Sequence, residues 1–237
     1  MFTATYDQIK AVYQKKGYPF LENTGKEFNL NLIGIRNPDQ KADTFNDTEY
    51  MVWEYKGTKN AIGFPITTDP GVFYRNNPAA MAGTGILKEG FHKDLWQIAK
   101  HQGKYSALCQ RTPTWVIRDF DKDADLDFNQ PDLTKLTKKE LTLGGYKTYE
   151  WYDASNKLVW REQYGLFGVN NHRAAENGAS TKVYNWSAAC QVLQNRLRDF
   201  FGTKLYEFDY FMSICNKASK NCGPNFSYAL TNEKDFA

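Results

Sequence analysis

The sequence has no cationic start followed by an apolar stretch, and it has no later apolar run long enough to cross a membrane. We therefore predict a protein made in the cytoplasm without a signal peptide and without a membrane partner. Its four cysteines are too few for the disulfide framework of a small secreted domain. Its 30 basic and 27 acidic residues nearly balance and form no basic block, which argues against a nucleic-acid partner. These absences exclude classes of protein and name no function.

The chain is instead rich in aromatic residues, at 16%, and contains short β-prone runs separated by Gly, Pro, Asn and Asp. Such runs are typical of strands joined by turns. They lie at 28–35, 49–55, 105–110, 114–120, 166–170 and 226–230. Residues 147–152 and 158–163 alternate around a turn-prone segment and predict a hairpin. The polar segment 131–147 is interpreted as an excursion from the sheet.

Helical spacing of apolar residues appears at three places. Residues 5–16 predict a short amphipathic helix that ends at Gly17, and residues 205–220 predict another that ends before Gly223. The apolar residues of 192–201 predict a helix directly after Cys190. We therefore expect residues 1–237 to form one mainly β domain (α+β) with short helices near both ends.

The segment 168–192 carries the pattern that indicates chemistry. A predicted strand delivers His172, a polar loop follows, and Cys190 lies eighteen positions after the histidine. A thiol at the N-terminus of the predicted helix would be favoured as a thiolate, and the imidazole could exchange its proton during acyl transfer. From the pair alone, a packing cysteine and a satisfied strand histidine are the commoner explanation.

The wider context resembles the YkuD family of L,D-transpeptidases. The signature of that family is a His at a strand end, a loop, and then Ser-His-Gly-Cys before a helix. Here the last piece reads Ser187-Ala188-Ala189-Cys190, and the resemblance covers about residues 160–200. Residues 29–128 also resemble uncharacterised phage and Bacteroides-type proteins that carry a Ser-Ala-X-Cys-Gln variant of this motif.

The resemblance implies a β-sandwich of the L,D-transpeptidase catalytic-domain type, with short N-terminal and C-terminal helices. It implies that Cys190 is the nucleophile and His172 its base. The backbone carbonyl of Arg173 would orient the imidazole, and the N–H groups of Ala189 and Cys190 would form the oxyanion hole. Ser187 belongs to the same predicted catalytic segment.

Two positions depart from the family pattern. Ala188 stands where the family has a second histidine, and Val192 stands where it has an arginine. Arg173 or Arg196 could supply a replacement charge. We still expect a cysteine hydrolase that acts on bacterial peptidoglycan without a required cofactor, delivered to the cell wall by a phage as an endolysin. The alternative is a non-catalytic virion structural or packaged protein whose partners are other virion proteins.

Other polar residues are candidates for substrate contacts. His101 and Gln110 could line a cleft, although a surface histidine beside a glycine turn explains His101 equally well. Trp186 and Asn171 flank the predicted catalytic residues in sequence and complete the substrate-binding prediction.

Aspartates occupy alternate positions from near the end of the run 114–120 onwards. They are Asp119, Asp121, Asp123, Asp125 and Asp127. Hard oxygen ligands at this spacing can converge on calcium. The segment lacks the glycine and the bidentate glutamate of an EF-hand, so a solvated acidic turn competes with a structural calcium site at the first three aspartates.

Overall fold

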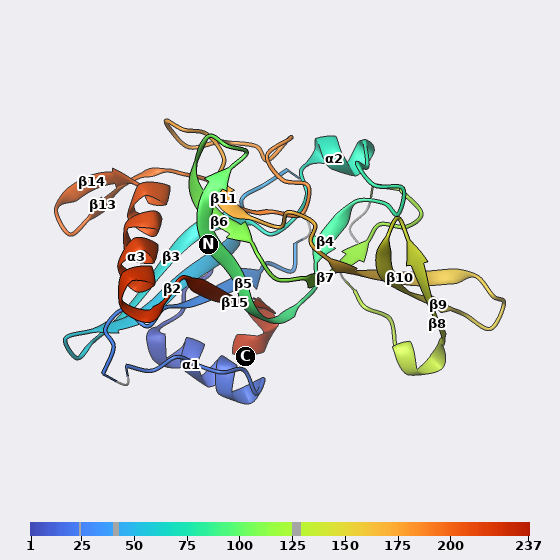
Figure 1. Ribbon diagram of the computed structural model, residues 1–237, viewed down its shortest axis with the longest axis horizontal. Coiled ribbons are helices and arrows are strands. Elements are labelled where there is room, and N and C mark those ends of the chain that lie inside the picture. The colour runs from blue at the N-terminus through green and yellow to red at the C-terminus, as the bar shows by residue number, and fades with distance from the viewer. Residues whose placement is uncertain (24, 40–42, 125–128) are drawn as a thin grey trace.

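The computed structural model describes residues 1–23, 25–39, 43–124 and 129–237. Most of its regular structure is strand, as the sequence predicts. Eight strands form a closed barrel, in the order β1 (Asn31–Arg36), β15 (Asn225–Asn232), β5 (Gly90–His101), β6 (Tyr105–Gln110), β11 (Asn171–Arg173), β12 (Gln191–Leu193), β3 (Thr58–Thr67) and β2 (Asp47–Tyr55). The barrel occupies the left and centre of Figure 1.

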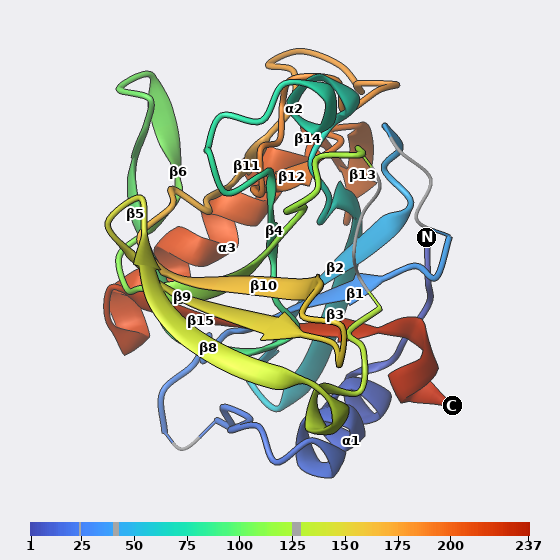
Figure 2. The same cartoon turned by 90° about the vertical axis from the view of Figure 1, so that its right-hand side faces the viewer.

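A separate five-stranded sheet lies to the right of the barrel in Figure 1 and faces the viewer in Figure 2. Its order is β4 (Gly85–Leu87), β7 (Thr114–Arg118), β10 (Leu158–Gly165), β9 (Tyr146–Tyr152) and β8 (Thr137–Leu143). A small hairpin, β13 (Leu197–Phe200) with β14 (Thr203–Tyr206), completes the strands. The predicted hairpin of 147–152 and 158–163 is confirmed as β9 and β10.

The strands thus form a closed barrel beside a second sheet, where the sequence predicted a β-sandwich. Closure depends on two parallel pairings, β1 with β15 and β11 with β12. The first joins segments at opposite ends of the chain, and the second joins segments on either side of the loop that contains Ser187. The alternation of apolar residues shows that a strand is half-buried and does not show which strand it pairs with, so it cannot separate a sandwich from a barrel.

Two predicted helices are confirmed. α1 (Tyr6–Lys15) begins with a capping box between Thr5 and Gln8, and its buried Ile9 joins an apolar cluster with Ile33 of β1. α3 (Glu207–Cys222) adds Phe211 and its neighbours to a second, larger cluster on the barrel. The shorter helical segments are α2 (Val72–Asn76), η1 (Leu133–Lys135) and η2 (Glu233–Phe236). No helix in the described ranges is long and apolar enough to cross a membrane.

Three local predictions were wrong. The segment after Cys190 forms β12 and β13 in place of a helix, because its apolar residues are used as two short strands around the turn-like segment 194–196. The polar segment expected to leave the sheet contains β8, whose residues are mostly exposed because the strand is at the sheet edge. The strand predicted at 166–170 is irregular, and β11 begins only at Asn171.

Candidate active site

The predicted base lies on β11, beside the parallel strand that follows the predicted nucleophile. In β11 and β12, Asn171 pairs with Gln191 and His172 pairs with Val192, and the Gln191 N–H donates to the carbonyl oxygen of Asn170 at 2.9 Å. Cys190 immediately precedes β12. Side chains alternate along a strand, so an extended backbone at Cys190 would place its side chain on the face that carries His172 and Val192.

The opposite face of this strand pair carries a buried polar network. Asn171 Nδ2 donates to both carboxylate oxygens of Glu49, at 2.7 and 2.8 Å, and the Tyr228 hydroxyl donates to Gln191 Oε1 at 2.9 Å. Burial raises the pKa of Glu49 to about 8. The predicted substrate-binding role of Asn171 is therefore not supported, because its side chain points away from the face that carries His172.

The strand geometry sets the separation of the thiol and the imidazole. For ideal neighbouring strands, a two-residue offset corresponds to a Cα separation of about 8 Å. Two inclined side chains can span that separation. In this structure the thiol donates to the carbonyl oxygen of Gly168 at 3.4 Å, and no thiol–imidazole hydrogen bond forms between these two described residues.

The backbone fixes the orientation of the His172 ring. Nδ1 lies 2.8 Å from the carbonyl oxygen of Arg173, which is the contact that the family resemblance implies. A carbonyl oxygen only accepts, so this contact favours the tautomer with the proton on Nδ1 and a basic Nε2; the backbone of Trp186 also contacts the ring. The Tyr105 hydroxyl donates to the same carbonyl at 3.2 Å and lies 3.4 Å from Nδ1. Burial, with a smaller contribution from His101, lowers the pKa of His172 to about 3.

His101 is buried against the predicted base. The two imidazoles stack with centroids 4.2 Å apart and an angle of 19°, and His101 Nδ1 lies 3.1 Å from Asn170 Nδ2. Only 7% of His101 is exposed, so the surface interpretation is wrong. His101 and His172 line a pocket of about 640 Å³ that also includes Trp186, which is 41% exposed. The sequence therefore named three residues that share one pocket.

The Cys190 thiol differs from the sequence prediction. Its predicted activation rested on a helix N-terminus, and β12 stands there instead. Burial raises the pKa of the Cys190 thiol to about 11. At neutral pH both the thiol and the His172 imidazole are therefore uncharged, and a preformed thiolate is not the resting state.

The segment before Cys190 is a tight turn. The Ser187 hydroxyl donates to the carbonyl oxygen of Cys190 at 2.9 Å and accepts from the Ala189 N–H at 3.4 Å. The Ala189 N–H, which was predicted to form part of the oxyanion hole, thus points at the Ser187 hydroxyl in this structure. Ala189 has a φ of 143°, a conformation that is rare outside glycine. The segment is anchored to the region before α2, because Gly71 N–H donates to the Ser187 carbonyl oxygen at 2.9 Å.

Gln110 has a structural role. Its Oε1 accepts from the N–H groups of Phe167 and Val169, both at 2.9 Å, and its Nε2 donates to the carbonyl oxygens of Thr112 and Gly165. All of its hydrogen-bonding capacity is used to hold the segment that leads into β11. The predicted substrate contact by Gln110 is therefore not supported.

Three carboxylates gather directly after β7. Oxygen atoms of Asp119, Asp121 and Asp123 lie within 4.8 Å of one another and could hold a metal ion. Asp119 is buried, and its Oδ2 atom has no hydrogen-bond partner. Burial, together with the two neighbouring aspartates, raises the pKa of Asp119 to about 6. Asp125 and Asp127 of the predicted run lie outside the described residues.

Sequence reasoning missed Tyr105 and Tyr74, which also line the His172 pocket. Tyr105 could have been found from the sequence. The turn-prone Gln102 and Gly103 indicate a hairpin, and in the β5–β6 hairpin Tyr105 pairs with His101. The guanidinium of Arg173 covers the Tyr105 ring at 4.3 Å. No comparable signal existed for Tyr74.

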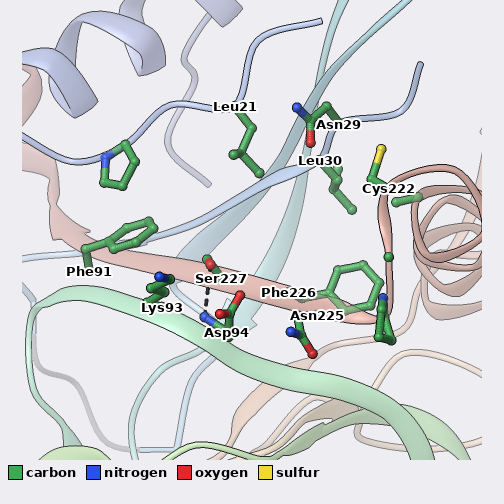
Figure 3. Close-up of a pocket in the computed structure, with 14 residues that line it drawn as sticks. Leu21, Asn29, Leu30, Phe91, Lys93, Asp94, Cys222, Asn225, Phe226 and Ser227 are labelled. Carbon is green, nitrogen blue, oxygen red and sulfur yellow. Dashed lines mark hydrogen bonds between the residues drawn. The ribbon is translucent and has the colours of Figure 1, made fainter. Parts of the chain in front are cut away.

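A different pocket lies between the end of α3 and the strands β5 and β15 (Figure 3). Its volume is about 350 Å³, and Cys222 and Phe226 are among its lining residues. Figure 3 shows Asp94 and Ser227 side by side, where the Asp94 N–H donates to the Ser227 hydroxyl at 3.0 Å. None of the predicted site residues lines this pocket, so it is separate from the candidate active site.

Comparisons of the chain with family models, with curated proteins and with solved structures found no match. The resemblance to the YkuD family therefore rests on the sequence motif alone.

Proposed function

We propose that the chain is a cysteine acyl-transfer enzyme that cleaves peptidoglycan stem peptides. The observation that carries the proposal is the placement of His172. Its ring is held by the Arg173 carbonyl, it opens on a pocket, and it lies on the strand next to β12, which Cys190 immediately precedes. The residues support the chemistry, and the resemblance to L,D-transpeptidases supports the substrate.

The uncharged state of both groups suggests the order of proton transfer. As Cys190 Sγ forms a bond to the scissile carbonyl carbon, His172 Nε2 accepts the thiol proton. The imidazolium then gives that proton to the leaving amine, and a thioester remains on Cys190. Water attacks the thioester, loses a proton to Nε2, and releases the acid while the thiol is restored. The thiol must first rotate away from Gly168.

The backbone at Ala189 gives further support. The family signature has glycine immediately before the cysteine, and this position carries a glycine-like φ of 143° here although alanine occupies it. Strained residues persist where surrounding structure fixes them, and they concentrate at active sites. The tight turn therefore supports a role for the segment 187–190 beyond packing.

Hydrolysis is the outcome that we favour, in the setting of a phage lysin delivered to the bacterial cell wall. Trp186 and His101 are the pocket residues proposed to contact the substrate. The second candidate is a non-catalytic virion protein that keeps the fold. The raised pKa of Cys190 and the lack of a thiol–imidazole hydrogen bond favour it, whereas the oriented imidazole favours the enzyme.

The test is incubation of purified protein with peptidoglycan, followed by mass spectrometry of the released fragments. We expect cleavage by the wild type and losses of at least about 100-fold in Cys190→Ala and His172→Gln, because both residues belong to one proton-transfer unit. Cys109→Ala is the matched control, since Cys109 is a second half-buried thiol on the neighbouring β6. A folded Cys190→Ala protein with wild-type activity would exclude the enzyme proposal.

The three aspartates after β7 are proposed to hold a structural calcium ion. The buried, unpartnered Oδ2 atom of Asp119 supports this, because an acidic oxygen without a donor is costly unless a cation or a proton balances it. The proposed peptide chemistry does not use this ion.

A further inference from the structure

A third pocket adjoins the turn that precedes Cys190. Its volume is about 250 Å³, and Ala188 and Ala189 form part of its wall. Strands of the five-stranded sheet provide Gly85, Val116 and Arg118. Tyr74 lines both this pocket and the His172 pocket, so the two are neighbours around the same turn.

Arg118 places a positive charge in this pocket. The residue is only 7% exposed. Its Nε donates to Gln163 Oε1 at 2.8 Å, its Nη1 donates to the Gly83 carbonyl oxygen at 3.1 Å, and its guanidinium covers the Phe167 ring at 4.8 Å. All of these partners are uncharged. Among residues 1–23, 25–39, 43–124 and 129–237, no carboxylate lies within ion-pair distance of Arg118, and its Nη2 donates no hydrogen bond.

Other arginines of the chain show how a cation is usually neutralised. Arg161, on the same sheet, contacts Glu150 at 2.5 Å, and Arg196 contacts Glu207 at 2.8 Å. A buried guanidinium without an acid is unfavourable, and an anion that enters the pocket would offset that cost. Burial lowers the pKa of Arg118 only to about 10, so the group is charged at neutral pH.

The shape of the pocket restricts the anion. Small residues form much of the wall, namely Ala79, Ala80, Gly83, Gly85, Ala188 and Ala189. A Cβ placed on Gly85 would lie 2.9 Å from Arg118 Nη1 and 3.8 Å from the Ala189 Cβ. The guanidinium is therefore close to the residue that precedes Cys190, and only a small group fits between them.

We propose that Arg118 binds the free α-carboxylate of a peptide whose last residue is small. Guanidinium and carboxylate groups match in geometry, and the adjoining apolar wall suits a short side chain. Resting on the proposed function, a carboxylate site beside Ala189, the residue before Cys190, makes the enzyme an exopeptidase that acts near a C-terminus. An internal peptide bond has no carboxylate to offer at this position.

Binding is tested apart from turnover, with Cys190→Ala protein titrated by N-acetyl-L-alanyl-D-alanine and by the same peptide with an amidated C-terminus. Chemical-shift changes measured by NMR give each Kd. We expect the free acid to bind at least about tenfold more tightly than the amide, and we expect Arg118→Gln to remove that difference. Arg161→Gln is the matched control and keeps it, because Arg161 already contacts an acid.

Gly85→Ala provides a second test that keeps the charge. The new Cβ would meet Arg118 Nη1 at 2.9 Å and move the flexible end of the side chain, so the preference for the free acid should fall. Thermal melting shows whether each variant is folded. The proposal is overturned if the parent Cys190→Ala protein binds the acid and the amide equally. It is also overturned if folded Arg118→Gln keeps the preference for the free acid. If Arg118→Gln does not fold, an unchanged preference in Gly85→Ala overturns it. If the Cys190→Ala protein prefers the free acid but the wild type does not cleave peptidoglycan, only the proposed function is overturned.

Discussion

The barrel and the five-stranded sheet treat ionisable side chains differently. In the barrel, burial moves the pKa values of His172, Cys190 and Glu49 towards their uncharged forms at neutral pH. In and directly after β7 of the sheet, Arg118 stays charged, and Asp119 lies in an acidic cluster. The barrel thus holds these groups in their uncharged forms, and the sheet is suited to holding ions. The turn at 187–190 lies where the two meet.

The pH dependence of Cys190 alkylation gives the largest expected effect and tests the barrel side. With a thiol pKa near 11, the thiolate fraction rises about tenfold per pH unit, so the rate with iodoacetamide should rise about 1000-fold between pH 7 and pH 10. Mass spectrometry of the labelled peptide measures it. A plateau reached below pH 8 would contradict this and would indicate a preformed thiolate–imidazolium pair. His172→Gln should leave the profile nearly unchanged.

The next largest expected effect is on the free energy of unfolding, whose pH dependence should change when Glu49 is replaced. Its folded-state pKa is raised to about 8 from an ordinary 4.5, so the folded protein binds this proton more tightly than the unfolded chain. The stabilisation is complete below pH 4.5 and is lost as the pH rises towards 8. Relative to wild type, Glu49→Gln should therefore gain at most about 1.4 kcal/mol per pH unit across that window.

Urea unfolding of both proteins at pH 5 and pH 7.5 measures this difference. Glu140→Gln is the control, because Glu140 is on the exposed strand β8. A Glu49→Gln difference that stays constant with pH would show that this buried acid is charged in the folded protein.

Added calcium tests whether the acidic cluster after β7 of the five-stranded sheet binds an ion. At a calcium concentration ten times Kd, binding to the folded state adds about 1.4 kcal/mol, which corresponds to roughly 3–5 °C in Tm for a chain of this size. Chelator should reverse the shift, and Asp119→Asn should abolish it. A Tm that does not respond to millimolar calcium would leave a solvated acidic turn as the explanation of the cluster.

Ala189 gives the smallest effect, at the turn between the two regions. Glycine adopts a φ of 143° without the cost that alanine incurs, although it loses more backbone entropy on folding. Ala189→Gly should therefore raise the free energy of unfolding by about 1 kcal/mol. Ala188→Gly, at a position without positive φ, should bring no gain. Denaturant unfolding measures both, and equal effects would show that Ala189 is not strained.

Local pattern predicted much of the fold. The capping residues and apolar spacing of α1, the hairpin β9–β10 and the strand β15 all follow from neighbours in the sequence. Barrel closure did not follow, because it depends on pairings between distant segments, such as β1 with β15 and β12 with β3. The helix expected after Cys190 failed because helical spacing of a few apolar residues also fits two short strands with a turn between them.

The candidate site was predicted in part, for similar reasons. His172, His101 and Trp186 share a pocket, yet the chain gave no sign that Gln110 would use its whole amide on backbone groups. Arg118 was not recognised, since an arginine in a strand normally finds an acid. The absence of such an acid becomes visible only when the neighbours are placed in space.

The position of β15 in the barrel has a consequence for folding during synthesis. β15 lies between β1 and β5, so two strands from the first half of the chain share no direct pairing and wait for residues 225–232. During synthesis from the N-terminus, the barrel remains open until that late strand leaves the ribosome. Any product that stops before Asn225 would expose the unpaired edges of β1 and β5, and we expect it to aggregate or be degraded before a site can form.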